Sequence, residues 1–376
     1  MVEQAPAAAS HRSRTRLVVQ GLLSLVLVVA IFYYLRKKFD PAQAWAAITA
    51  MTGLELSILG LLAVWNLCTY AFVWMMVTPG LGFRRAMVMT QATTAVANTV
   101  PGGSAIGIGM TYSMLGSWGY SRSRSTTAVL VSGVWNSFIK LAMPVLALAL
   151  VALQGGRTGG RVVAALLGIA GLVAAIVVFA LLLRSEEAAR RFGLLAGRIA
   201  TRLRRILRRG PVAGWELATV KFRARTVDLV EHRWVGITVT SLVSHLSLYV
   251  VLLVALRDVG VSEAEVGWVE VLAVFAFARL ATAIPLTPGG AGFVEGVLFT
   301  GLVGAGGDPA QVAAAVVVYR ALTWALPILV GIGCYGWWRR RTWTATPQDT
   351  ASGPGGTGPS PGEAAVTTNP HPRVRR

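Results

Sequence analysis

The chain has 376 residues and a mean hydropathy of +0.61, with 55% hydrophobic and only 14% charged residues. Soluble domains carry about 25% charged residues, so this composition excludes an ordinary soluble protein. Several apolar runs reach the roughly 20 residues that cross a bilayer as a helix, so we expect an all-α polytopic membrane protein. Basic cytoplasmic loops account for the net charge of +19, and the two cysteines imply no disulfide framework.

The first part of the chain predicts two spans. Residues 1–16 are basic and are expected to form a cytoplasmic N-terminus. The apolar run 17–35 is long for a signal peptide and lacks a small-residue cleavage site, so we expect a retained helix. A short connector at 39–52 leads to a second span at 54–77, which returns to the cytoplasm at Arg84.

An apolar segment at 86–115 is interrupted by a Pro-Gly-Gly tripeptide at 101–103. Each arm measures about 18–21 Å at the helical rise, which is short of the roughly 30 Å hydrocarbon core. The segment is either a re-entrant hairpin or one kinked span. Basic residues on both sides, including Arg122 and Arg124, favour a hairpin that enters from the cytoplasm.

The middle of the chain predicts three further spans around a basic loop. Residues 125–153 cross outward, 161–183 cross back, and 236–256 cross outward again. Between them, residues 184–235 hold 13 Lys and Arg against 5 Asp and Glu, which indicates a cytoplasmic loop. Apolar and basic residues alternate at helical spacing over 192–206, which is typical of a helix lying on an anionic leaflet.

A second interrupted segment follows at 266–302, with its Pro-Gly-Gly at 288–290 and acidic residues on both sides. The last span is predicted at 311–338 and ends in three arginines, which places the chain inside again. Residues 342–376 are rich in Pro, Gly, Ser and Thr and are expected to form a disordered cytoplasmic tail. The prediction is thus about six full spans plus two re-entrant hairpins, or eight or more helices if each hairpin is a pair of short spans.

The two interrupted segments belong to a predicted internal repeat, with repeat one at about 54–183 and repeat two at about 236–338. The helix after each Pro-Gly-Gly carries a tryptophan, a basic residue and a late proline. The charges that flank the two segments are opposite, which predicts inverted copies. Irregular backbone at membrane depth requires burial in protein or a wet cavity, and inverted broken helices are a transporter design.

Four charged side chains fall inside predicted membrane segments: Lys140, Arg279, Glu295 and Arg320. Such charges are costly and usually face a partner or a cavity. Arg279 and Glu295 are expected at equal depth on the second hairpin, as a staple alone or as a staple that also binds ligand. Lys140 and Arg320 occupy matched places in the repeats; they either reach an anionic headgroup or are satisfied by helix carbonyls or Glu295.

Three further polar residues have a structural interpretation. His245 is expected to be a satisfied core histidine, with a proton relay as the alternative, and Asn98 and Asn136 to satisfy backbone groups near the first break. No nucleophile–base set, Walker loop or metal-ligand cluster is present in the sequence. We therefore expect neither an enzyme nor a cofactor or metal, and no nucleic-acid partner.

The stretch PLTPGGAGFVEG at 285–296 resembles the lysylphosphatidylglycerol synthase transmembrane-region family of flippase-like membrane proteins. Members share a late T-P-G-G-x-G-x-x-E element and an earlier P-G-G-x-G-like element. The resemblance covers roughly residues 17–340, and in the earlier element Ser104 and Ala105 delay the next glycine to Gly107. The matching positions are Thr287, Pro288, Gly289, Gly290, Gly292 and Glu295, and, earlier, Pro101, Gly102 and Gly103.

The resemblance implies a function in lipid movement. In the full-length synthases a soluble acyltransferase-like domain follows this region and makes the aminoacylated lipid, whereas here only residues 342–376 follow. We therefore expect a lipid translocase of the cytoplasmic membrane for an anionic or glycan- or isoprenoid-linked headgroup, without synthase activity. A scaffold for a separately encoded glycosyltransferase or aminoacyl-lipid synthase, and an ion-coupled small-solute transporter, remain as alternatives.

Overall fold

The computed structural model describes residues 40–100, 102–153, 215–282 and 287–344, with scattered positions between 170 and 201. Within these residues all regular structure is helical, which confirms the expected fold class. The predicted span 17–35, most of the span 161–183 and most of the amphipathic stretch 192–206 lie outside the described residues. Four described helices are long and apolar enough to cross a membrane: Gly53–Val77, Arg122–Val151, Leu229–Asp258 and Pro309–Arg341.

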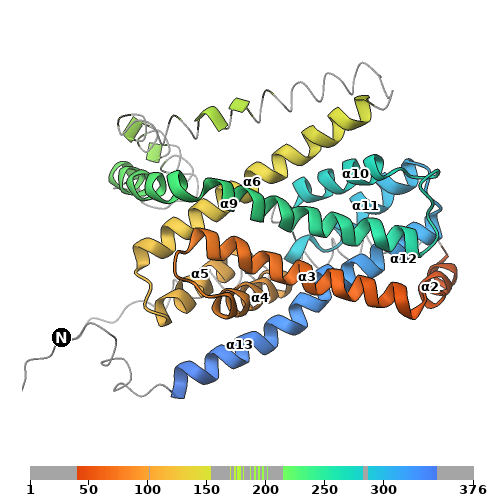
Figure 1. Cartoon of the computed structure of the whole chain (residues 1–376), viewed down its shortest axis with the longest axis horizontal. Coiled ribbons are helices and arrows are strands. Elements are labelled where there is room, and N and C mark those ends of the chain that lie inside the picture. Colours follow the sequence, from red (N-terminus) through yellow and green to blue (C-terminus); the bar gives the residue numbers. More distant parts are fainter. Residues whose placement is uncertain are drawn as a thin grey trace, which may run out of the picture. The chain divides into compact units, whose positions relative to one another are not determined.

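The first half of the described chain contains one long helix, two short helices and a second long helix (Figure 1). A short helix precedes them, capped by the side chain of Asp40, and the first long helix begins at a capping box formed by Thr52 and Glu55. The elements are α2 (Pro41–Thr49), α3 (Gly53–Val77), α4 (Phe83–Thr99), α5 (Gly103–Ser117) and α6 (Arg122–Leu153).

The second half repeats this order of long, short, short and long. Its first helix begins at Trp215, well before the predicted start at 236. The charged residues before 236 suggested a loop. A helix, however, forms its own backbone hydrogen bonds, so it can carry these charged residues beyond the bilayer. The elements are α9 (Trp215–Asp258), α10 (Trp268–Ala281), η1 (Pro288–Gly290), α11 (Phe293–Gly304), α12 (Pro309–Arg320), η2 (Ala321–Ala325) and α13 (Leu326–Thr344).

The chain divides into two compact units. Met1–Tyr335 contains the packed helices described below. Gly336–Arg376 contains, among its described residues, only the end of α13.

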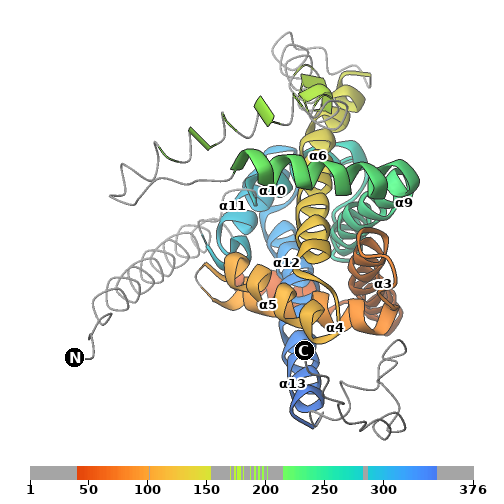
Figure 2. The same cartoon turned by 90° about the vertical axis from the view of Figure 1, so that its left-hand side faces the viewer.

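Both Pro-Gly-Gly tripeptides separate a pair of short helices. The pairs have 17 and 15 residues in α4 and α5, and 14 and 12 residues in α10 and α11. At 1.5 Å per residue these helices measure about 18–26 Å, less than a hydrocarbon core of about 30 Å. In each pair the two helices pack against one another, as Figure 2 shows for α4 and α5. Each pair is therefore a helical hairpin, which we call hairpin one (α4 and α5) and hairpin two (α10 and α11).

Glycine makes the turn in hairpin one possible. Gly102 has a φ of +69°, which side chains with a Cβ rarely adopt. A Cβ on Gly103 would lie 2.2 Å from the carbonyl oxygen of Val96 on α4. Only glycine therefore lets α5 start directly against the end of α4.

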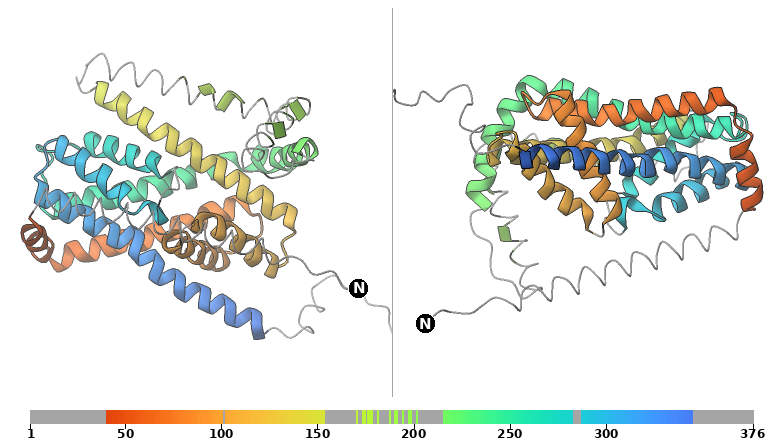
Figure 3. Two further views of the ribbon diagram at one scale, coloured as in Figure 1. Left: turned by 180° about the vertical axis from the view of Figure 1, so that it is seen from behind. Right: turned by 90° about the horizontal axis from the view of Figure 1, so that it is seen from below.

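The helices that precede the two hairpins, α3 and α9, pack in antiparallel directions (Figure 3). The Asn66 amide donates to Ser247 Oγ at 2.5 Å, and Thr69 Oγ1 donates to Ser244 Oγ at 3.3 Å. Residue numbers rise along α3 while those of their partners fall along α9. Antiparallel leading helices are what the predicted inverted repeat requires.

The largest cluster of buried apolar side chains surrounds hairpin two. Phe275 of α10 and Leu298 and Leu302 of α11 are fully buried, as are Leu252 and Leu256 of α9. In a membrane such contacts stabilise through close packing, because lipid tails are as apolar as the side chains. One face of hairpin two is therefore packed against protein, and such burial is what a broken helix needs.

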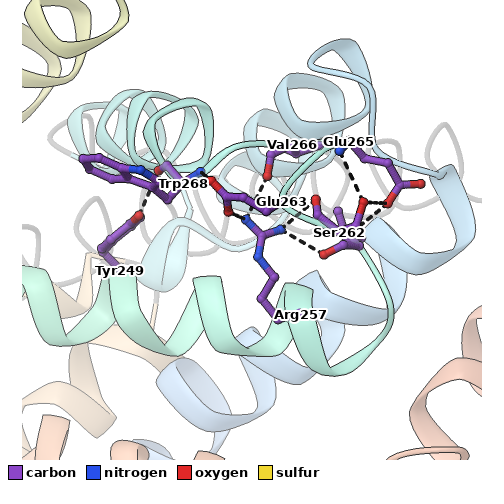
Figure 4. Close-up of polar contacts among 8 residues, drawn as sticks. Tyr249, Arg257, Ser262, Glu263, Glu265, Val266 and Trp268 are labelled. Carbon is purple, nitrogen blue, oxygen red and sulfur yellow. Dashed lines mark hydrogen bonds and ion pairs between the residues drawn. The ribbon is translucent and has the colours of Figure 1, made fainter. Parts of the chain in front are cut away.

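The loop between α9 and α10 is folded around Arg257 (Figure 4). Its guanidinium donates to the carbonyl oxygens of Val261 at 2.9 Å, Ser262 at 3.1 Å and Val266 at 2.9 Å. It also forms an ion pair with Glu263. One side chain thus satisfies four acceptors and fixes the entry to hairpin two, a role that the sequence did not predict.

Further polar contacts continue this arrangement into α10. The Trp268 backbone N–H donates to Glu263 at 2.9 Å, and the Tyr249 hydroxyl donates to the Trp268 carbonyl at 2.8 Å. The backbone N–H and the hydroxyl of Ser262 donate to Glu265 at 2.7 and 2.8 Å. These two hydrogen bonds lower the pKa of Glu265, because they stabilise its charged form.

Candidate functional site

Glu295 and Arg320 form a buried ion pair at the tip of hairpin two. Arg320 Nε donates to Glu295 Oε1 at 2.7 Å, and the side chains are only 13% and 11% exposed, respectively. Arg320 Nη2 also donates to the Gly289 carbonyl at 3.4 Å. Arg320 therefore ties the end of α12 to both the first turn of α11 and the η1 turn.

This pairing differs from the expected one between Arg279 and Glu295. Arg279 Nε is buried and has no hydrogen-bond partner among the described residues. The expected equal depth of Arg279 and Glu295 concerns only their positions along the helix axes. The direction in which each points depends on helix rotation, and the turn before α11 contains several residues with non-helical angles, including Gly292 at φ +80°.

Arg279 lies instead in a group of cations and polar rings. It interacts electrostatically with Lys140 on α6, with His245 on α9 and with Tyr319 on α12. Tyr319 interacts in turn with Arg320. The four charged residues predicted from sequence are thus brought into one interior group, which we call the cation cluster and which also includes His245.

The cation cluster has more positive than negative charge. It contains three cations, and its one ion pair within the described chain is that of Glu295 with Arg320. Lys140 and Arg279 make no ion pair with a described residue. In a segment that crosses a membrane, unpaired cations are costly and mark ion or ligand sites.

The tips of the two hairpins meet at Gly289. A Cβ there would lie 2.5 Å from Trp324 Nε1 on η2 and 2.6 Å from Asn98 Oδ1 on α4. Gly289 also has a φ of +58°, in the left-handed region. Pro101 lies outside the described residues, but α4 ends beside η1 and brings hairpin one to the ion pair.

A π-helical turn positions the Trp324 ring beside the ion pair. Residues Ala321–Ala325 form η2 directly after Arg320, and the Arg320 guanidinium lies 5.4 Å from the Trp324 ring centroid. Pro327 lacks an N–H for the carbonyl four residues earlier and its ring clashes there, which favours a local widening of the helix. The late proline was noted in the sequence as a repeat feature, and it could have predicted this turn.

Several buried polar atoms near the cluster have no hydrogen-bond partner among the described residues. They come from separate elements, and each costs about 1–3 kcal/mol if it stays unpaired. Most are donors, which suits a ligand with anionic or carbonyl oxygens. The donors are Arg279 Nε, Trp324 Nε1 and the hydroxyl Thr287 Oγ1, and the acceptors are Glu295 Oε2 and His245 Nε2.

A cavity of about 220 Å³, lined by both polar and apolar residues, lies between α3, α6 and α9. The sequence analysis did not predict it, although its polar residues recur three and four positions apart within apolar spans. That spacing puts them on one helix face and could have indicated the cavity. The polar lining residues are Tyr70, Ser132, Asn136, Ser241, Ser244 and His245.

No group of three potential metal ligands occurs among the described residues. A comparison with curated proteins finds no match to the chain. The model of one protein family, described as the lysylphosphatidylglycerol synthase TM region, matches residues 21–331 and includes both hairpins and the cation cluster. This multi-pass membrane protein therefore belongs to the lysylphosphatidylglycerol synthase transmembrane-region family.

Proposed function

We propose that the protein translocates a lipid with an anionic headgroup, and that the cation cluster binds this headgroup at mid-membrane depth. The observation that carries the proposal is the excess of cations beside the broken tip of hairpin two. Lys140 and Arg279 lack carboxylate partners in the described chain, while Glu295 occupies Arg320. An anionic phosphate would neutralise the excess, and arginine donates to it in bidentate fashion.

The arrangement of the helices supports movement as well as binding. Hairpins one and two are each too short to span the bilayer and are proposed to enter it from opposite faces as re-entrant segments. Their tips meet at Gly289, close to the Arg320–Glu295 pair. Inverted units that meet at a central site can expose it to either face alternately. The acyl chains would remain in the bilayer while the headgroup passes the cluster.

Translocation fits this chain better than synthesis. The family match is confined to the membrane region, and the described residues hold no catalytic constellation of nucleophile, base and orienting group. We propose that the protein is not an enzyme and that its partners are anionic membrane lipids. Proteoliposomes in which fluorescent phosphatidylglycerol is quenched from outside provide the test.

The expected result is rapid lipid movement with the wild type and at least a tenfold lower rate with Arg279→Gln or Lys140→Gln. Arg122→Gln, an exposed arginine at the start of α6, is the matched control and should retain the wild-type rate. Equal rates in empty and protein-containing liposomes would contradict the proposal. If a lipid-modifying enzyme then co-purified with the protein, the scaffold function would gain support.

A further inference from the structure

We infer that the cavity between α3, α6 and α9 is a subsite for neutral hydroxyl groups, so that the translocated lipid carries a polyol or sugar beside its anionic phosphate. The inference rests on the proposed function and names the substrate class. It follows from the hydrogen-bond chemistry of His245, the lining of the cavity and its position next to Lys140.

His245 presents a hydrogen-bond acceptor with no partner among the described residues. Its Nδ1 lies 3.0 Å from the carbonyl oxygen of Ser241, and a carbonyl can only accept, so Nδ1 carries the hydrogen. The other nitrogen, Nε2, then has only a lone pair. His245 is 5% exposed and lines the cavity, and Nε2 has no partner. An ionised phosphate or carboxylate oxygen cannot satisfy this atom, because it has no hydrogen to donate.

The donor that Nε2 requires is a neutral one. Lys140 and Arg279 both interact electrostatically with the His245 ring, so a ligand ammonium would be repelled there. Among the described residues that line the cavity, none is acidic, so no carboxylate could compensate a cation. The lining offers hydroxyl groups and the Asn136 amide, which both donate and accept. Hydroxyl groups of a polyol or sugar match this environment.

The cavity and the cation cluster are adjacent along α6. Asn136 lines the cavity, and Lys140 follows it by four residues, so both lie on one helix face about 6 Å apart. A headgroup whose hydroxyls contact Asn136 and His245 would therefore place its phosphate beside Lys140. At about 220 Å³ the cavity is also several times the roughly 30 Å³ that a water occupies in the liquid.

The test measures lipid selectivity in two ways. In proteoliposomes, the wild type should move phosphatidylglycerol and phosphatidylinositol at least fivefold faster than phosphatidic acid, which has the phosphate alone. His245→Leu and Asn136→Leu should bring this ratio close to one, and His245→Gln, which keeps an acceptor, should restore part of it. Ser137→Ala, on α6 but bonded to the Gly133 carbonyl, is the control. Size-exclusion profiles select variants that remain folded.

Equilibrium binding of short-chain phosphatidylinositol and phosphatidic acid to the purified protein separates the two proposals. Preferential binding of phosphatidylinositol that depends on His245 would support the subsite, even if no lipid moved and the translocase function failed. Equal binding of both lipids would overturn the subsite, even if translocation were observed. Preferred movement of lysyl-phosphatidylglycerol over phosphatidylglycerol would also overturn it, because that headgroup brings an ammonium.

Discussion

Two arginines on either side of α10, Arg257 before it and Arg279 in its last turn, differ in how their guanidinium groups are satisfied. Arg257, at the end of α9, donates to three backbone carbonyls and pairs with Glu263. Arg279, in the last turn of α10, has a buried Nε without a hydrogen-bond partner among the described residues and lies near another cation, Lys140. The first guanidinium stabilises a loop, whereas we propose that the second binds a ligand.

The comparison shows that partner satisfaction separates structural charges from candidate site charges. Both arginines adjoin apolar runs, and residue type alone does not distinguish them. A satisfied guanidinium contributes to folding through its hydrogen bonds. An unsatisfied buried one costs stability, and such costs concentrate at functional sites.

The largest effect is expected at the one carboxylate of the cation cluster. Glu295→Gln would leave Arg320 buried without a counter-charge, and loss of one partner of a buried pair costs about 3–5 kcal/mol. Thermal unfolding in detergent should show a strongly lowered midpoint. The double variant Glu295→Leu with Arg320→Met should recover much of the loss, because no unpaired charge remains. A double variant as unstable as Glu295→Gln would show that charge imbalance is not the cause.

The contact between the hairpin tips comes next. Gly289→Ala adds a Cβ in a left-handed conformation, at about 1–2 kcal/mol, and overpacks against Trp324 and Asn98, at about 1–3 kcal/mol. Unfolding midpoints should fall accordingly. Gly102→Ala is the matched control, since its φ of +69° is similar but nothing lies within 4 Å of the added Cβ. If both variants lost the same stability, the tips would not press together at Gly289.

Replacing Arg257 should destabilise the protein, whereas replacing Arg279 should not. Arg257→Leu removes hydrogen bonds from a charged donor to four acceptors and should destabilise the loop at 259–267 by about 1.5–3 kcal/mol. Arg279→Met removes a charge that has no ion-pair partner among the described residues, and it should be neutral or stabilising by about 1 kcal/mol in lipid-free detergent. Hydrogen exchange of the loop and unfolding midpoints provide the measurements. Destabilisation by Arg279→Met equal to that by Arg257→Leu would remove the basis of the comparison.

Much of this architecture could be predicted from the sequence because its physics is local. Apolar run length identified the long helices, and the Pro-Gly-Gly tripeptides identified both breaks, since proline and glycine disturb helices wherever they occur. The cost of charge in a membrane likewise selected Lys140, Arg279, Glu295 and Arg320, which the structure gathers into one cluster.

The partners of those charges could be predicted only as alternatives, among them Glu295 for Arg320, because the choice depends on helix rotation and on contacts between distant segments. The depth of the two residues along hairpin two predicted an ion pair between Arg279 and Glu295. The rotation of the helices instead places Glu295 against Arg320. His245 was interpreted as a satisfied core residue, whereas only one of its ring nitrogens has a partner. His245 lines a cavity together with side chains from α3 and α6, which no local pattern in α9 reveals.

The smallest effect concerns acid and the loop that Arg257 organises. Hydrogen bonds from Ser262 hold the pKa of Glu265 below its ordinary value of 4.5, so the folded loop favours the carboxylate. The contribution is therefore complete above about pH 4.5, the unfolded value, and is lost as the pH falls through the lower folded value. Loop hydrogen exchange, corrected for intrinsic rates, should accelerate slightly below pH 4.5. Ser262→Ala should reduce this dependence, because one of the two hydrogen bonds is gone, while the backbone donor keeps a remainder. A pH response unchanged in Ser262→Ala would contradict the assignment of the acid sensitivity of the loop to Glu265.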